Sequence, residues 1–160
     1  MLIPDANVLL YAVNADVEQH AEAKAWLDGA LSRREAVGFG WVVLLAFIRI
    51  STRAGIFDRP LTTDEAMGIV EAWLAQASAV VAEPTTRHAA ILRGLLDEVG
   101  AGGNLVTDAH IAALAVEHAA EIATYDSDFD RFPGVRWRRP TLENTGSDVA
   151  LPKSGATSNE

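Results

Sequence analysis

The amino-acid sequence predicts an α/β domain in which a short, mostly parallel central sheet is flanked by helices on both faces. Three observations support this prediction. Short apolar segments alternate along the chain with longer segments whose apolar residues recur at helical spacing. This alternation is typical of parallel sheets with crossover helices. The chain has 160 residues, which fits one domain, and 49% of them are hydrophobic, which is enough for a core.

The first half of the chain is predicted to contain two strands and three helices. In order, these are a strand over 1–4, a helix over 6–13, a helix over 20–31, a strand over 37–40 and a helix over 41–52. The strand over 1–4 is short and apolar and stops at Asp5. The helix over 41–52 is so strongly apolar that we expect it to be largely buried.

The second half continues the alternation and ends with a weak strand. Its predicted elements are a helix from 63 to about 76, a strand over 79–82, helices over 86–99 and about 105–118, a strand over 121–124 and an edge strand over 135–137. Thr62 and Glu65 form the pattern of a capping box at the start of the first of these helices. The glycine-rich segment 100–103 breaks the helical pattern, and Asn104 is the expected N-cap of the next helix.

The end of the chain differs in composition from the rest. Between residues 143 and 160 the apolar residues are only Val149, Ala150, Leu151 and Ala156. We therefore expect a folded domain over 1–142 and a polar, disordered tail over 143–160. Neither an internal repeat nor a second domain is evident.

Charge and composition exclude several classes of function. The net charge is −9, which argues against a general nucleic-acid coat or a basic membrane binder. It leaves open a local nucleic-acid site at which a divalent cation supplies positive charge. The absence of cysteine excludes disulfides, thiolate metal sites and cysteine nucleophiles. The longest apolar run, over 41–48, is far shorter than the roughly 20 residues of a membrane span. No signal peptide is evident, so we expect a cytoplasmic protein.

Three carboxylates lie where such a fold brings side chains together. Asp5 ends the first predicted strand, Asp126 follows the strand over 121–124, and Asp108 lies in the first turn of a helix. Because ligands bind outside the carboxyl ends of parallel strands, we expect these side chains to share one crevice. Crowded carboxylates are unfavourable unless a proton or a cation intervenes. Oxygen ligands suit Mg²⁺ or Mn²⁺, which activate water and stabilise a phosphoryl oxyanion.

These residues also have structural interpretations. Asp108 at a helix start is favoured by the helix dipole, and Asp126 and Asp128 lie in a turn, where Asp is common. His110 and His118 lie eight positions apart on one predicted helix, which is not the four-residue spacing of a histidine metal site. We therefore expect no metal ligation by histidine.

Three segments carry the acidic residues just described, namely 4–12, 104–115 and 123–129. Together, and in this order and spacing, they resemble the motifs of PIN-domain ribonucleases, most closely the VapC-type toxins of bacterial toxin–antitoxin pairs. The resemblance covers roughly residues 1–140. It implies a PIN-like three-layer fold and a Mg²⁺- or Mn²⁺-dependent endoribonuclease that cleaves RNA. It also implies a homodimer and a cognate antitoxin protein that plugs the acidic pocket.

The resemblance assigns roles residue by residue. The acidic metal-site positions of the family are matched by Asp5, Asp108 and Asp126, and the positions that support them by Asn7, Thr124 and Asp128. One element departs from the pattern. The family commonly has a Glu-x-x-Arg setting in its third helix, and here Ala46 stands in place of the Glu while Arg49 is kept. This predicts a site of three carboxylates with room for a fourth.

Several arginines are candidates for RNA contact, although each is also an ordinary surface arginine. Arg49 and Arg53 lie four apart and are expected to extend along one face of the third helix, the face of Ala46. Arg49 is expected either to pair with a site carboxylate or to meet a substrate phosphate. A second cluster near the end of the domain contains Arg136, Arg138 and Arg139.

Two other functions compete with RNA cleavage. An aspartyl-phosphate phosphatase of the haloacid-dehalogenase type also has an Asp after its first strand. However, it has a second Asp two positions on, where this chain has Asn7, and it needs a downstream Lys. The two lysines here, Lys24 and Lys153, are not suitably placed. The other alternative is a catalytically weak PIN-like interaction module, supported only by Ala46. The sequence does not distinguish transfer, ribosomal and messenger RNA as targets.

Overall fold

The computed structural model describes residues 1–100, 103 and 105–141. The predicted tail over 143–160 and the predicted cap Asn104 lie outside the described residues. The centre of the molecule is a five-stranded sheet with the order β3-β2-β1-β4-β5. The strands are β1 Leu2–Pro4, β2 Val37–Phe39, β3 Ala79–Val81, β4 Glu121–Ala123 and β5 Trp137–Arg138. Neighbouring strands all pair in parallel, which confirms the predicted α/β class.

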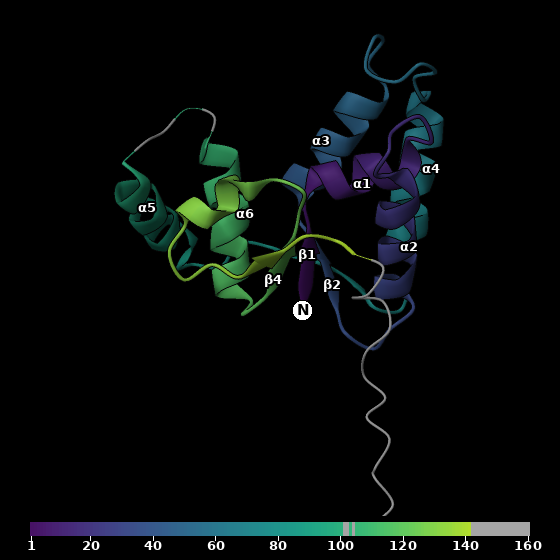
Figure 1. Ribbon diagram of the computed structural model, residues 1–160. Helices are drawn as coiled ribbons and strands as arrows, with labels where there is room; N and C mark the ends of the chain where they lie inside the picture. The colour runs from purple at the N-terminus through teal and green to yellow at the C-terminus, as the bar shows by residue number, and fades with distance from the viewer. Residues whose placement is uncertain (101–102, 104, 142–160) are drawn as a thin grey trace, which may run out of the picture.

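The helices cover both faces of this sheet (Figure 1). Those described are α1 Ala6–Val13, α2 His20–Leu31, α3 Trp41–Ser51, α4 Thr63–Leu74, α5 His88–Val99 and α6 Leu105–Glu117, with a short 3₁₀ helix, η1, over Ser127–Arg131. Helices α1 to α4 lie on one side, and α5 and α6 on the other. The three-layer arrangement explains why short strands such as β1 are buried along their whole length.

The capping box predicted at the start of α4 is present. The Thr62 hydroxyl accepts a hydrogen bond from the Glu65 backbone N–H at 3.1 Å, and Glu65 Oε2 accepts one from the Thr62 N–H at 2.7 Å. The predicted break after α5 is also present, because Gly100 caps that helix in the left-handed conformation at φ 65°. Within the part of the chain that the structure describes, no helix is both long and apolar enough to cross a membrane.

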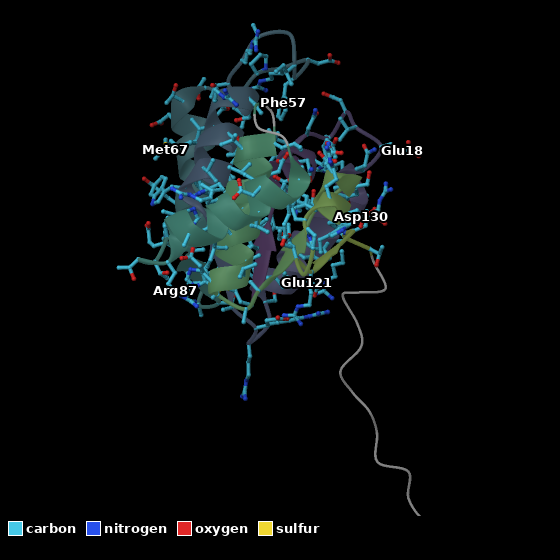
Figure 2. All side chains as sticks on the ribbon, turned by 90° about the vertical axis from the view of Figure 1, so that its left-hand side faces the viewer. Glu18, Phe57, Met67, Arg87, Glu121 and Asp130 are labelled. Carbon is cyan, nitrogen blue, oxygen red and sulfur yellow. The ribbon has the colours of Figure 1, made fainter. Side chains whose placement is uncertain are left out.

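The register of the sheet places the ends of β1 and β4 side by side. Leu2 pairs with Glu121 and Pro4 with Ala123, and the N–H of Asp5 donates to the Ala123 carbonyl at 2.9 Å. In Figure 2, Glu121, where β4 begins, lies toward the lower end of the molecule, so the strands run upward from there. The carboxyl ends of the strands thus form a single edge, which we call the carboxyl edge.

The prediction of a largely buried helix over 41–52 is wrong for one face of α3. Val43, Leu44 and Phe47 pack in the core, but Trp41 is 44% exposed and Leu45 is 58% exposed. Only one face of α3 meets the neighbouring layer, whereas apolar residues occur on both faces. Local apolarity therefore overestimated the burial. The edge strand predicted over 135–137 also forms two residues later than expected at its start, at Trp137–Arg138.

Candidate functional site

Asp5 begins α1 directly after β1 and is held by three hydrogen bonds. Its Oδ1 accepts from the Ala6 N–H at 2.6 Å, so the side chain caps α1. Its Oδ2 accepts from the Thr124 hydroxyl and from Asn7 Nδ2, both at 2.8 Å. Asp5 is only 8% exposed. Sequence analysis predicted the position of this carboxylate, and the structure adds that it is fixed in one orientation.

Asn7 and Thr124 link the ends of β1 and β4 around this carboxylate. Asn7 Nδ2 also donates to Thr124 Oγ1 at 3.0 Å, and Asn7 Oδ1 accepts from the Tyr125 N–H at 3.2 Å. Thr124 Oγ1 accepts from the Asp126 N–H at 3.0 Å. Each side chain thus bonds both to Asp5 and to the segment that carries Asp126.

Asp126 and Asp128 lie on the exposed turn that follows β4. Asp126 precedes η1, and its Oδ1 accepts from the Asp128 N–H at 2.8 Å. Asp126 therefore also has the capping role that a turn Asp commonly has.

Four carboxylates on three segments influence one another electrostatically. Burial, followed by the charges of Asp5, Asp126 and Asp128, raises the pKa of Asp108 to about 6. Burial also raises the pKa of Asp5, and the charge of Asp126 adds to this, while hydrogen bonds from Thr124, Ala6 and Asn7 oppose it. Asp108, in the first turn of α6, is therefore close enough to Asp5 and Asp126, the other two predicted metal-site residues, for their charges to raise its pKa.

The donor set at this edge fits a hard divalent cation. All the contributing groups are carboxylates, amides or hydroxyls, which Mg²⁺ and Mn²⁺ prefer. Burial raises the pKa of Asp108, and repulsion by the neighbouring carboxylates raises it further; a bound cation would relieve that repulsion. As the side chains stand, however, no three His, Asp or Glu residues among those described are arranged to hold a metal ion. Ligation at this edge therefore needs side-chain adjustment.

The third-helix positions are placed as follows. Ala46 is half-buried on α3, and Arg49 on the same helix is exposed. Arg53 is also exposed, but it lies beyond the end of α3 rather than on it as predicted, because the helix ends at Ser51 with Thr52 as its C-cap. Among the described residues, no carboxylate lies within 4 Å of either arginine. Pairing of Arg49 with a site carboxylate, one of the two expected roles, is therefore absent from this structure.

Sequence analysis did not identify Tyr125 as part of this region. Its hydroxyl donates to Glu22 Oε2 at 3.2 Å, and its ring meets the Tyr11 ring edge-on with centroids 5.2 Å apart. The Arg139 guanidinium lies over the Tyr125 ring, 5.0 Å from its centroid. The available signal was the place of Tyr125 between Thr124 and Asp126 in the third motif.

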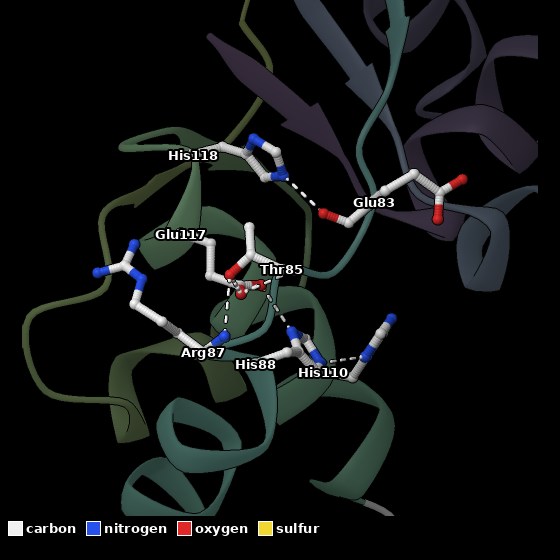
Figure 3. Close-up of polar contacts among 7 residues, drawn as sticks. All are labelled: Glu83, Thr85, Arg87, His88, His110, Glu117 and His118. Carbon is white, nitrogen blue, oxygen red and sulfur yellow. Dashed lines mark hydrogen bonds and ion pairs between the residues drawn. The ribbon is translucent and has the colours of Figure 1, made fainter.

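A polar network anchors α6, the helix that carries Asp108, to α5 (Figure 3). His88 Nδ1 lies 2.6 Å from Glu117 Oε2, and His88 Nε2 lies 2.8 Å from His110 Nδ1. Glu117 Oε1 accepts from both the N–H and the hydroxyl of Thr85. The Glu117 side chain is fully buried and that of His88 is 13% exposed. Sequence analysis found no role for these histidines, because the partners are far apart in the chain.

The chain is similar to proteins of known family. A family model described as PIN domain matches residues 2–135. Ribonuclease VapC37 of Mycobacterium tuberculosis is 59% identical over 140 residues, covering 88% of this chain and 97% of that protein. Ribonuclease VapC33 of the same species is 38% identical over 143 residues, covering 89% of this chain and 100% of that protein.

Solved structures share the fold at low sequence identity. The crystal structure of VapC20, a sarcin–ricin loop cleaving toxin of Mycobacterium tuberculosis, has a TM-score of 0.62 at 18% identity, covering 85% of this chain and 99% of that one. VapBC2 of Rickettsia felis, bound to a DNA fragment from its promoter, has a TM-score of 0.61 at 16% identity, covering 86% and 97%. At such identities the likeness establishes the fold alone.

Proposed function

The chain belongs to the PIN domain family, and on that premise we propose that it is a VapC-type endoribonuclease. In this proposal it cleaves RNA with a divalent cation, Mg²⁺ or Mn²⁺, and is the toxin of a toxin–antitoxin pair. The observation that carries the proposal is the group of carboxylates at the carboxyl edge, whose repulsion contributes to raising the pKa of Asp108 to about 6. The similarity to proteins named ribonucleases supports the choice of RNA as substrate.

Asp5, Asp108 and Asp126 are the residues proposed to hold the cation. A Mg²⁺ or Mn²⁺ ion bound there supplies positive charge for a phosphoryl oxyanion and activates water. Asn7 and Thr124 orient Asp5 by donating hydrogen bonds to its Oδ2. Asp128 adds negative charge near Asp108 and is proposed to support the site from the turn.

We also propose two protein partners. A cognate antitoxin is supported by the likeness to VapBC structures, and a second copy of this chain by the exposed side chains of Trp41 and Leu45 on α3. Exposed apolar side chains of this size favour a protein interface over solvent.

The competing functions have less support. The phosphatase alternative needs a lysine near Asp5, but Lys24 pairs with Asp28 on the surface of α2 at 2.5 Å. The non-catalytic alternative is supported by Ala46 alone, and it predicts that the carboxylates are dispensable for RNA cleavage.

The decisive experiment compares two substitutions of the same chemistry. RNA cleavage by the purified protein is measured with Mn²⁺ and with excess chelator. We expect Asp126→Asn to abolish cleavage and Asp28→Asn, which breaks an exposed ion pair of small energetic value, to leave it unchanged. Cleavage that survives in chelator, or in the Asp126→Asn protein, would refute metal-dependent catalysis at this edge.

A further inference from the structure

Arg139 lies at the carboxyl edge because of the register of β5. Ala123 of β4 pairs with Arg138 of β5, and the Thr124 N–H donates to the Arg138 carbonyl at 3.0 Å. The next residue, Arg139, therefore lies beside the segment Thr124–Tyr125, just past the strand ends. Asp126 follows directly in the same segment.

The three clustered arginines of this region differ in where their charges lie. Arg136 Nη2 donates to the Ala119 carbonyl at 3.0 Å, and Arg138 Nε lies 3.5 Å from Glu121 Oε2. Ala119 and Glu121 lie at the amino end of β4. The Arg139 guanidinium instead lies over the ring of Tyr125, which follows the carboxyl end of β4.

The ring that carries the Arg139 guanidinium is itself held in place. Tyr125 is fixed through its hydroxyl by Glu22 of α2, through its ring by Tyr11 of α1, and through its N–H by Asn7. A guanidinium over such a ring gains cation–π attraction, which favours one position of a long side chain.

We propose that Arg139, seated on the Tyr125 ring, binds a backbone phosphate of the RNA beside the carboxylates, and that Tyr125 is the positioning residue for this contact. The proposal rests on the function proposed above. A protein with a net charge of −9 needs cationic groups where a polyanion approaches its acidic edge. The Arg139 side chain is exposed, and the planar donors of a guanidinium match a phosphate.

The test measures RNA binding without cleavage. The full chain with Asp126→Asn serves as the parent protein. The probe is a fluorescein-labelled single-stranded RNA of mixed sequence. Its binding is measured by fluorescence anisotropy at a series of salt concentrations. Adding Arg139→Gln is expected to raise the Kd about tenfold, as for the loss of one charge-assisted contact. It should also make the dependence of log K on log salt shallower by about 0.7, the value for one single-strand phosphate.

A matched control separates a local contact from a change in net charge. Arg87 is exposed and lies with Glu121 toward the lower end of the molecule in Figure 2, opposite the carboxyl edge. Arg87→Gln changes the charge equally and should leave the Kd within about twofold. Equal effects of Arg87→Gln and Arg139→Gln would overturn the proposal.

The role of Tyr125 is tested by two further variants of the same parent. Tyr125→Phe keeps the ring and should bind as the parent does. Tyr125→Leu removes the ring and should raise the Kd for RNA nearly as much as Arg139→Gln does. The double variant should bind RNA only slightly more weakly than Arg139→Gln alone. If Tyr125→Leu unfolds, the Arg139→Gln and Arg87→Gln pair decides alone.

The outcomes distinguish this proposal from the proposed function. If the parent binds RNA and Arg139→Gln binds equally well, the phosphate contact is refuted while RNA cleavage stands. If neither the parent nor the wild-type chain binds RNA, both fail. Weakened binding of a co-purified antitoxin by Arg139→Gln, with RNA binding unchanged, would assign the guanidinium to a protein partner and likewise refute the RNA contact.

Discussion

The hydroxyl of Thr124 donates to Asp5 Oδ2 at 2.8 Å and so joins two residues that are 119 positions apart in the chain. Thr124 is fully buried and Asp5 is 8% exposed. Because a buried carboxylate oxygen depends on its donors, this hydrogen bond couples the stability of the domain to the orientation of a proposed metal ligand.

The first prediction concerns this hydrogen bond. Thr124→Val removes the donor at nearly constant volume and leaves Asp5 Oδ2 with only the hydrogen bond from Asn7. We expect it to lower the free energy of unfolding by about 1–3 kcal/mol and to reduce RNA cleavage. Thr124→Ser, which keeps a hydroxyl, should retain most of the stability and most of the RNA cleavage. Urea denaturation, monitored by circular dichroism, measures the difference in the free energy of unfolding. Equal stability of the Thr124→Val and Thr124→Ser variants would contradict the prediction.

The second prediction concerns Asp108 in metal-free buffer. Burial and the neighbouring carboxylates raise its pKa to about 6 from its ordinary value of 3.8. The folded state therefore holds this proton more tightly than the unfolded state, so stability falls as pH rises between these two values. Asp108→Asn removes the ionisation. The Tm of Asp108→Asn should exceed that of the wild type at a pH above about 6, the pKa of Asp108 in the folded state. The two Tm values should converge near pH 3.8, the pKa of Asp108 in the unfolded state.

The same variant tests cation binding. Mn²⁺ should raise the Tm of the wild type, because a ligand that binds only the folded state stabilises it. It should have little effect on Asp108→Asn. A variant that is less stable than the wild type at neutral pH, or that gains equally from Mn²⁺, would contradict the arrangement.

The third prediction concerns the vacant acidic position on α3. Ala46→Glu adds an anionic ligand if α3 presents this residue to the carboxylates, and should tighten Mn²⁺ binding measured by isothermal titration. Ala46→Gln adds the same length without the charge and serves as the control. Unchanged affinity in Ala46→Glu would mean that α3 turns this position away or that Asp128 already acts as the fourth acid.

The fourth prediction concerns the anchor between α5 and α6. Burial raises the pKa of Glu117, but hydrogen bonds from Thr85 and His88 outweigh it, and the pKa is lowered from 4.5. Glu117 therefore contributes stability that is present above pH 4.5 and lost as the pH falls through the lower folded value. Glu117→Gln should destabilise the protein by about 1 kcal/mol at neutral pH and less in acid. Glu98→Gln, on the exposed side of α5, is the matched control in thermal melts.

The fifth prediction concerns self-association through α3. Leu45 is 58% exposed, and Leu45→Glu should reduce the mass measured by light scattering at micromolar concentration. Val116→Glu changes a residue on α6 that is 43% exposed and should leave the mass unchanged. A monomeric wild-type chain in the absence of antitoxin would refute the homodimer.

Sequence analysis predicted most of the helices and strands, because the patterns that mark them lie within a few neighbouring residues. The capping box depends only on Thr62 and Glu65, which are three positions apart. The break after α5 depends only on the glycine-rich segment that follows it. The positions of Asp5 and Asp126 followed from the rule that parallel strands end at one edge, which needs only the strand boundaries.

The features that sequence analysis missed depend on packing between distant segments. The His88–Glu117 contact requires the placement of α5 on α6, for which no local pattern is informative. The contact of Arg139 with Tyr125 depends on the register of β5, which begins at 137 rather than 135. In a two-residue strand the side chains alternate between faces, so small errors in register reverse their placement.

The pairing of β1 with β4 has a consequence for the order of synthesis. Asp5 leaves the ribosome well before β4, so β1 lacks its β4 neighbour until residues 121–123 have followed. A nascent or truncated chain that stops before β4 can pair β1 only with β2, and it leaves the other edge of β1 open. Such a chain has neither Thr124 nor Asp126. Chains that stop before β4 are therefore expected to lack part of the proposed metal site, and RNA cleavage would require β4 and the segment that follows it.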